Sequence, residues 1–414
     1  MKNLSKRGIW CGSTEAGTTQ ASVDAYVDRM HKAGFNLLLV HLKGGDGRIF
    51  WPSEDFADIV APGYHDFDLP AALLNSCRER GIELHAWFID YMEGSETFAA
   101  HPEWAQRDWK GRPTSAEVLR GEAFPFTWMC PARRPGYTDQ RLVPLYREFA
   151  EKYAFDAIHH DYIRYPGDLA PDQYCFCDYC LEAIPRWAGY TSETFPDEPF
   201  YHELYDREYL EAHWEQSPRV LPRNWAALDR GSKARFLLEG GFFQGGRADL
   251  DYFFYTFRVE QIREFARLTS EAVRKARPGM KLSAAVFKNP IHSGRFIGQD
   301  WRRFEGFVDH LLPMDYRDHY PGDFETYLAL LKESIEQQKV WAKNFEALWP
   351  GFAINFLYRE EDETGQAASP EKLQRVVEAI ASTGVNGLAV FCEGHLHQYK
   401  LWDAMREVLG AVPS

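Results

Sequence analysis

The sequence predicts an α/β fold, a single (β/α)8 TIM barrel with a long insertion after strand 4. Short apolar runs alternate with helical patterns along the 414 residues, which is typical of parallel βα units. Polar side chains gather where these runs end, and barrel active sites lie at the C-terminal strand ends. No G-x-G-x-x-G follows the first run, which disfavours the alternative, an open doubly wound sheet. We therefore expect one catalytic domain over residues 1–414.

Each expected element has a local signal in the chain. Thr19 and Asp68 are suited to cap helices, Pro70 suits a first helical turn, and Gly34 and Gly81 suit helix ends. The expected strands are residues 7–11, 36–42, 82–89, a run within 154–168, 281–287, 307–314, 352–356 and 387–392. The expected helices include residues 19–32, 69–80, 139–152, 251–276, 324–341, 370–384 and 396–409. The irregular insertion covers about 167–249.

Composition limits the classes of partner. The net charge of −14 disfavours nucleic acid, because a phosphate backbone would be repelled. No apolar run approaches the ~20 residues that cross a bilayer, and no apolar segment follows the basic N-terminal residues. We therefore expect no membrane contact, no signal peptide in this sequence and a cytoplasmic location. The oligomeric state is not predicted.

The end of the fourth strand, AFDAIHHDYIRYPGD at 154–168, concentrates polar groups in a way that favours a site. Asp161 is the expected catalytic carboxylate. His159, two residues earlier, should share its face and orient it or tune its pKa. Arg164 would position substrate or the carboxylate, or form a structural ion pair.

Side chains at other strand ends should also point into the C-terminal end of the barrel, because successive strand residues alternate between the two faces. By this alternation His41 shares a face with Lys43, Met314 with Tyr316, Ala353 with Asn355 and Phe391 with Glu393. The residues expected to contact substrate are His159, Arg164, Tyr316, His41, Lys43, Trp87, Asp90 and Asn355. Each of these residues could instead have a purely structural role, as part of the packed core or as a solvated charge. The 13 Trp and 21 Tyr suit clefts for amphipathic ligands such as sugars.

Several motifs together resemble the glycosyl-hydrolase-like family 10, long known as domain of unknown function 187. They are RGIW (7–10), GFNLLLVHLKGGDGRIFWPS (34–53), GIELHAWF (81–88), HPEW (101–104), FDAIHHDYIRYP (155–166), FVDHLLPMDY (307–316) and GVNGLAVF (384–391). The resemblance implies a TIM-barrel glycosidase, with members associated with bacterial cell-wall or other polysaccharides. It places Asp161 where related barrels carry a catalytic carboxylate. His160, Asp90 and the insertion depart from the pattern and leave the substrate open.

Glycoside hydrolysis usually uses two carboxyl groups, and the sequence leaves the second one open. Glu393 has the right position at strand eight. Asp315 ends strand six, but the alternation sets it opposite Met314 and Tyr316. Asp90 is a further alternative. Any of them could instead be a solvated loop carboxylate or an ion-pair partner.

Cysteine and histidine spacings raise the question of a metal. Seven cysteines suit a reducing compartment, and Cys175, Cys177 and Cys180 form C-x-C-x2-C. Zinc normally takes four ligands and no fourth is evident in the sequence, so structural zinc and packed thiols both stay open. His395 and His397 are interpreted as substrate contacts or a helix start. No catalytic metal or other cofactor is expected.

The leading hypothesis is a glycosidase that cleaves O-glycosidic bonds of an oligo- or polysaccharide with paired carboxylates. The alternatives are a non-catalytic carbohydrate-binding barrel and a metal-dependent hydrolase. The sugar, the linkage and the stereochemical outcome are not determined by the sequence.

Overall fold

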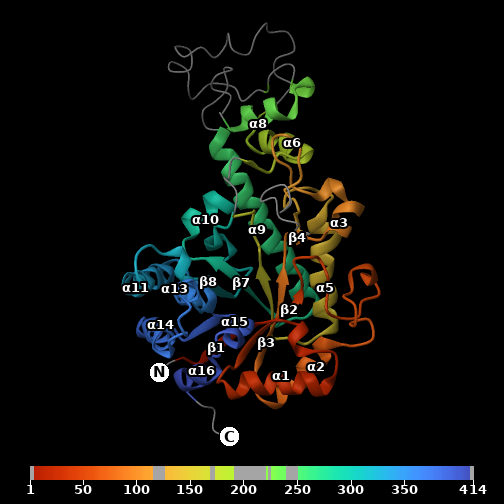
Figure 1. Cartoon of the computed structure of the whole chain (residues 1–414). Helices are drawn as coiled ribbons and strands as arrows, with labels where there is room; N and C mark the ends of the chain where they lie inside the picture. The colour runs from red at the N-terminus through yellow and green to blue at the C-terminus, as the bar shows by residue number, and fades with distance from the viewer. Residues whose placement is uncertain are drawn as a thin grey trace.

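The computed structural model describes residues 4–114, 126–167, 173–190, 221, 225–238 and 250–410. Within this part of the chain, eight parallel strands close into a barrel surrounded by helices (Figure 1). The strands are β1 (Lys6–Cys11), β2 (Leu37–Lys43), β3 (Glu83–Ile89), β6 (Ala157–Asp161), β7 (Lys281–Phe287), β8 (His310–Met314), β10 (Gly351–Ala353) and β11 (Gly387–Phe391). The predicted TIM barrel is confirmed.

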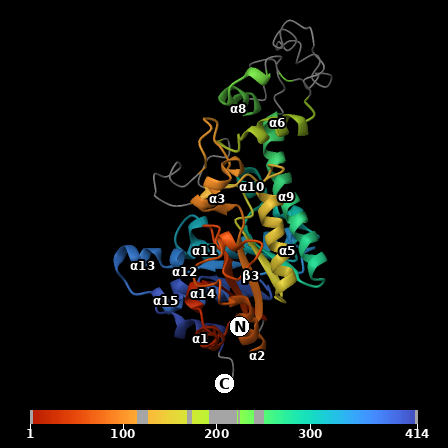
Figure 2. The ribbon, with the colours of Figure 1, turned by 90° about the vertical axis from the view of Figure 1, so that its right-hand side faces the viewer.

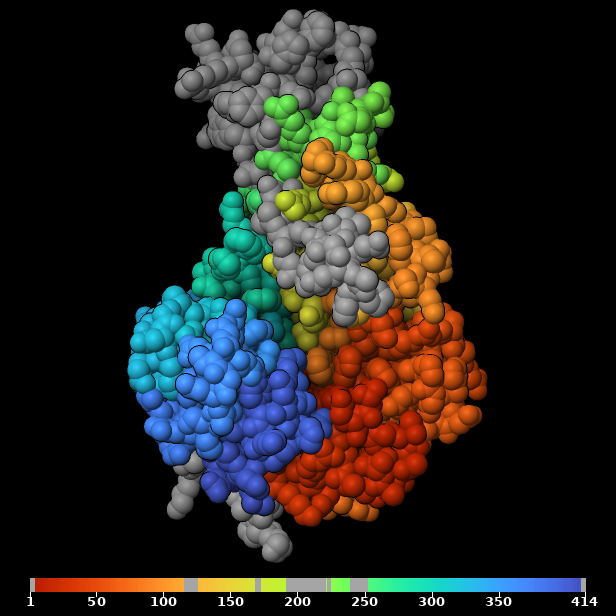
Figure 3. Space-filling view, in the orientation of Figure 1, coloured from red at the N-terminus to blue at the C-terminus, as the bar shows by residue number. Residues whose placement is uncertain are grey.

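The barrel closes where the two ends of the chain meet. Strand β1 pairs in parallel with both β2 and β11. Figure 3 shows the first units, in red, directly beside the last ones, in dark blue. Closure therefore leaves no free edge between the first and eighth strands.

The seventh position is the least regular part of the barrel. The short β9 (Ala347–Leu348) pairs with the start of β8, and β10 meets β8 only at Gly351 and Met314. The expected strand at 352–356 is wrong beyond Ala353, because the chain turns into helix α12 (Ile354–Leu357). Ile354 and Leu357, three residues apart, bury their side chains on one side of that turn.

Helices α1 (Gln20–Lys32) and α2 (Leu69–Glu79) begin where the sequence predicted. Thr19 accepts a hydrogen bond from the Ser22 amide at 3.1 Å, and Asp68 accepts one from Ala71 at 3.0 Å. The outer helices also include α5 (Val143–Lys152), α9 (Leu250–Ala276), α11 (Phe324–Trp341), α14 (Pro370–Ser382), α15 (Glu393–Gln398) and α16 (Trp402–Leu409). The expected helix at 396–409 is thus divided in two, and Lys400 between the halves has a positive φ of 56°.

The insertion extends the molecule beyond the C-terminal ends of the strands. Helices α6 (Asp178–Trp187) and α8 (Arg230–Leu238) lie there with the first part of α9 (Figures 1 and 2). At 27 residues, α9 is roughly 40 Å long, so it connects the barrel wall to this extension. In the described part of the chain, no helix is long and apolar enough to cross a membrane.

Candidate active site

Aromatic rings gather at the C-terminal end of the barrel. His41 and Trp87 have ring centroids 4.6 Å apart, Trp87 and Phe391 6.3 Å, and Phe391 and Tyr316 5.8 Å. These side chains come from β2, β3, β11 and the residues after β8. We call His41, Trp87, Asp161, Tyr316 and Phe391 the barrel mouth.

Asp161, the last residue of β6, is the carboxylate of the mouth. Its Oδ2 accepts a hydrogen bond from Trp87 Nε1 at 3.1 Å, and its Oδ1 accepts one from the Tyr162 amide at 2.7 Å. The residue is 8% exposed. Burial raises the pKa of Asp161 to about 6, although the Arg164 guanidinium and both hydrogen bonds favour the charged form. Asp161 can therefore both hold and release a proton near neutral pH.

Arg164 lies within a cage of aromatic rings next to this carboxylate. Its guanidinium carbon is 4.3 Å from the centroid of Tyr162, 5.4 Å from that of Trp128 and 5.3 Å from that of Phe287. The rings attract the cation through their π faces and fix its position. The cage keeps the positive charge near Asp161, where it opposes the effect of burial on the pKa.

His159 lies on the inner face of β6, below Asp161. It accepts from Trp10 Nε1 on Nε2 (3.1 Å), so its Nδ1 carries the proton and donates to Ser283 Oγ (2.8 Å). Burial lowers the pKa of His159 well below its ordinary value, which keeps the ring neutral. Among the described contacts it makes no hydrogen bond to Asp161. The shared face is as predicted, but His159 supports the barrel interior.

His41 remains at the mouth, whereas Lys43 does not. Burial, with the Lys43 charge, lowers the pKa of His41 to about 4, so its ring is neutral beside Trp87. Lys43 is fully buried, lies 3.1 Å from Glu93 Oε1 and donates to the Ile89 carbonyl at 2.7 Å. The expected shared face is wrong because the pairing of β2 with β3 shifts register between His41 and Lys43, which interrupts the alternation.

Asp90 is also turned away from the mouth, contrary to expectation. It is fully buried behind the barrel wall, where it accepts from Tyr146 Oη of α5 at 2.7 Å. His160 Nδ1 lies 2.9 Å from its other oxygen. Asp90 and His160 therefore tie β3 and β6 to the helix layer.

Asp315 faces helix α11 and not the mouth. It accepts from Gln338 Nε2 at 2.9 Å and from Ser334 Oγ at 3.3 Å, and the Tyr320 hydroxyl also donates to it. Burial raises the pKa of Asp315 to about 6. Strand alternation predicted that Asp315 points away from Tyr316, and its contacts with α11 show this direction. The expectation that Asp315 supplies a catalytic carboxylate therefore has no geometric support.

Glu393 does not share the mouth-facing side of Phe391, so this expectation is wrong. Strand β11 ends at Phe391 and α15 begins at Glu393, so strand alternation does not apply. Glu393 accepts from Tyr26 Oη of α1 at 2.9 Å and lies 3.6 Å from Arg29 Nη1. Burial raises the pKa of Glu393 to about 7.

Asn355 lies in α12 and not in a strand, so its predicted alternation with Ala353 is wrong. Its Oδ1 is buried without a hydrogen-bond partner among the residues described. The neighbouring Phe356 ring is 6.0 Å from Tyr316. His395 lies closer to the mouth, with its ring 5.8 Å from Phe391.

Two residues near the mouth were missed by the sequence reasoning. Trp128, which touches Tyr162 and Arg164, belongs to a loop far from any predicted strand end. Asp318 lies in the short helix η10 (Arg317–His319) directly after β8. Burial raises the pKa of Tyr316 well above its ordinary value, and the charges of Asp161 and Asp318 add to the rise. Two carboxylates therefore act on the Tyr316 phenol. The second acid in DYRD (315–318) was the available signal.

Residues 8–346 match the family described as "putative glycosyl hydrolase domain" (DUF4015). The chain belongs to this family. The sequence resemblance is thus confirmed for the glycosyl hydrolase class, while the more specific label of glycosyl-hydrolase-like family 10 is not. A comparison with curated proteins gives no match.

Three solved structures named as glycoside hydrolases or glycosidases share this fold. The glycoside hydrolase domain of PgaB (BpsB) from Bordetella bronchiseptica has a TM-score of 0.64 at 13% identity, with 99% of each chain covered. The β-amylase catalytic domain from Paenibacillus polymyxa gives 0.58 at 13% identity, again over 99% of each chain. A β-galactosidase from Rahnella sp. R3 gives 0.61 at 14% identity, covering 94% of this chain and 50% of that one. These likenesses show the fold.

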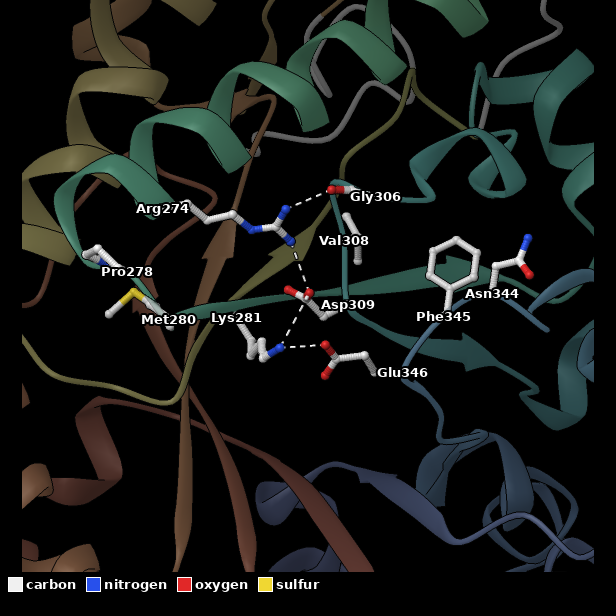
Figure 4. A pocket seen from close by; sticks show the side chains of 11 residues that line it. Arg274, Pro278, Met280, Lys281, Gly306, Val308, Asp309, Asn344, Phe345 and Glu346 are labelled. Carbon is white, nitrogen blue, oxygen red and sulfur yellow. Dashed lines mark hydrogen bonds and ion pairs between the residues drawn. The ribbon is translucent and has the colours of Figure 1, made fainter.

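A separate hollow of about 520 Å³ lies at the opposite end of the barrel (Figure 4). Lys281 begins β7 and Asp309 precedes β8, so the hollow is at the N-terminal strand ends. Arg274 lies 3.0 Å from Asp309, and Lys281 pairs with Glu346, so these opposite charges neutralise one another. At this end of a barrel such groups serve stability.

Among the residues that the structure describes, two groups of side chains have the composition of metal ligands. Glu83, His85 and His310 lie together inside the barrel, near the N-terminal ends of its strands. Glu83 is already paired with Lys6 and with His85 at 2.9 Å, so internal bonds satisfy its carboxylate. The second group is the four thiols of Cys130, Cys175, Cys177 and Cys180. Cys130 is the fourth sulfur that the sequence did not reveal.

Proposed function

We propose that this protein is a glycoside hydrolase that cleaves O-glycosidic bonds of an oligo- or polysaccharide at the barrel mouth. Asp161 is its catalytic acid. One observation carries the proposal: a buried carboxyl group with a pKa of about 6 stands at the end of β6 inside an aromatic opening. Membership of a glycosyl hydrolase family supports the reaction class.

In the proposed reaction, protonated Asp161 donates its proton to the glycosidic oxygen as the bond from that oxygen to the anomeric carbon breaks. The oxygen leaves as an alcohol, and water supplies the hydroxyl that ends on the anomeric carbon. The donors Trp87 Nε1 and the Tyr162 amide, together with Arg164, stabilise the carboxylate that results. Burial and these donors oppose one another, so the pKa of about 6 leaves both protonation states of Asp161 accessible.

The rings of Trp87, Tyr316 and Phe391 supply the surface on which a sugar would pack. Flat aromatic side chains offer apolar contact with little conformational entropy to lose, and Trp and Tyr add a polar edge. His41, held neutral, adds a further ring without introducing a charge. This lining suits a neutral, amphipathic ligand.

Asp318 is the proposed second carboxylate. Asp315, Asp90 and Glu393 are all hydrogen-bonded toward the helix layer. Asp318 follows β8, lies on the surface, and its charge reaches the Tyr316 phenol that also faces Asp161. As a general base it would activate the attacking water while Asp161 protonates the leaving oxygen, the arrangement of an inverting enzyme.

A carbohydrate-binding barrel without catalysis is the second candidate. It is favoured by the finding that Asp161 alone, of the carboxylates expected at the mouth, has contacts there. Such a protein would bind glycans through the same rings and leave them intact.

A single set of measurements separates the two candidates. Wild-type protein and Asp161→Asn are incubated with a panel of aryl glycosides, oligosaccharides and polysaccharides, and new reducing ends and binding are both recorded. Turnover by the wild type that Asp161→Asn lacks, with glycan binding retained, supports the hydrolase. Binding without turnover by either protein would favour the binding barrel. Asp403→Asn, an exposed aspartate on α16, is the matched control and should behave as the wild type.

A further inference from the structure

Four cysteine sulfurs meet in one buried cluster outside the barrel mouth. The Sγ atoms of Cys130, Cys175, Cys177 and Cys180 all lie within 4.8 Å of one another. Cys130 Sγ is 3.5 Å from Cys180 Sγ and 3.7 Å from Cys177 Sγ. Each of these residues is at most 2% exposed. We call these four residues the thiol cluster.

The distances match the edges of a metal-centred tetrahedron. A tetrahedral zinc with Zn–S bonds of about 2.3 Å places its sulfurs roughly 3.8 Å apart. The Cys130–Cys180 and Cys130–Cys177 separations of 3.5 and 3.7 Å are close to that value and far above the ~2.05 Å of a disulfide. All seven cysteines of the chain are free.

Packing alone does not account for this arrangement. The other cysteines are spread over separate elements, Cys11 on β1, Cys77 on α2 and Cys392 after β11. The thiol cluster instead gathers sulfurs from two distant segments. Cys130 follows β5 (Thr127–Trp128), while the other three lie 45 to 50 residues later in C-x-C-x2-C around the start of α6. Two ligands separated by two residues at a helix start, completed from a second segment, is a spacing that zinc sites use.

We propose that the thiol cluster is a tetrathiolate site that binds one structural zinc ion. Four sulfurs complete the tetrahedral shell and leave no position for substrate or water, so the site is structural and not catalytic. Their mutual closeness leaves room for one ion and not for a polynuclear iron–sulfur cluster. A tetrahedral set of four thiolates selects zinc or a single iron.

The ion would join the loop after β3 to the segment after β6, the two segments that flank Asp161. Trp128, two residues before Cys130, packs on Tyr162 at 5.6 Å and lies over Arg164. On the other side, the Phe176 amide donates to the Arg107 carbonyl at 2.8 Å, which brings the same two segments together. The site therefore fixes the aromatic wall that holds Arg164 beside the catalytic acid.

Metal analysis of the purified protein tests the proposal. Wild type should carry about one zinc per chain, as a closed structural site requires. Cys130→Ala should lose most of it, whereas Cys77→Ala, which removes a buried thiol elsewhere, should keep it. Wild type that stays metal-free after reduction and incubation with Zn²⁺, or Cys130→Ala that keeps full zinc, overturns the proposal. Stoichiometric iron overturns the assignment to zinc.

A second measurement uses only the wild-type chain, so it does not depend on whether Cys130→Ala folds. The bound metal is released with a thiol-directed mercurial and a chelator, the thiols are reduced, and Co²⁺ is added. Tetrahedral thiolate coordination should give intense visible d–d bands with sulfur-to-cobalt charge transfer. Only the weak bands of octahedral, oxygen-ligated Co²⁺ would contradict the site. Neither measurement depends on glycosidase activity.

Discussion

Buried carboxylates lie on both the inner and the outer face of the strand ends, but their exposure and their hydrogen-bond donors differ. Burial raises the pKa of Asp161, at the mouth, and of Asp315, behind the wall, to about 6 in each case. Asp161 is 8% exposed, whereas Asp315 is fully buried. A raised pKa therefore does not distinguish a candidate catalyst from a structural group, whereas access to the mouth does.

The hydrogen-bond donors also differ between the carboxylates of the outer face and Asp161 at the mouth. On the outer face, tyrosine hydroxyls donate to the carboxylates: Tyr146 to Asp90, Tyr320 to Asp315 and Tyr26 to Glu393. Tyr146 and Tyr26 lie on the outer helices α5 and α1, and for Asp315 it is Gln338 that supplies the contact with the outer helix α11. Asp161 instead accepts from an indole and a backbone amide, and 8% of its surface remains exposed.

The largest expected effect is at Asp161. Asp161→Asn should lower kcat by about 10²- to 10⁴-fold, because the amide cannot donate the proton that general acid catalysis supplies. Asp161 accepts through both of its oxygens, so one donor will face the new NH2 group and the free energy of unfolding should fall by about 1–3 kcal/mol. Initial rates on whichever glycan the wild type cleaves give the measurement. A variant with full activity would remove Asp161 from the mechanism.

The pH profile of the wild type should report the same group. A general acid with a pKa of about 6 is active while it carries its proton, so kcat/KM should fall as pH rises through about 6. Well above that value, the loss should approach about tenfold per pH unit, the titration of one group. A profile flat from pH 5 to 8 would contradict the assignment of Asp161 as the acid.

The contrasting variant is Asp315→Asn. The new amide would face the Gln338 amide and the Tyr320 hydroxyl, which are donors, so the free energy of unfolding should fall by about 1–3 kcal/mol. The kcat of the folded protein should stay close to that of the wild type. Denaturant unfolding gives the stability, with exposed Asp403→Asn as the unaffected comparison. A loss of turnover as large as that of Asp161→Asn would mean that the outer face takes part in catalysis.

The smallest expected effect is at Trp87. Trp87→Phe keeps a ring at the mouth but removes the donor to Asp161 Oδ2, a bond worth about 0.5–1.5 kcal/mol. Because that bond favours the anion, its loss should move the alkaline limb of the pH profile upward by up to about one pH unit. A limb that moves downward, or stays in place while KM alone changes, would show that the hydrogen bond does not tune Asp161.

The fold was largely readable from the sequence because its signals are local. Strand β7 and helix α11 lie at the predicted residues, and Thr19 and Asp68 cap the helices as expected. The predicted side-chain directions were wrong where a strand changes register or ends. The register shift after His41, and the helices that begin at Ile354 and Glu393, each ended the two-residue alternation on which side-chain direction was predicted.

By itself, the sequence determined the barrel, its helices and Asp161 as the polar end of the fourth strand, since periodicity and capping depend on near neighbours. Only the tertiary structure decided which carboxylates face the mouth, because side chains on outer helices bind the others: Tyr146 binds Asp90, Gln338 binds Asp315 and Tyr26 binds Glu393. It alone brought Cys130 to the three cysteines that lie 45 to 50 residues further on. Contacts between segments that are far apart in the chain leave no periodic signal, and the candidate sites of this protein depend on such contacts.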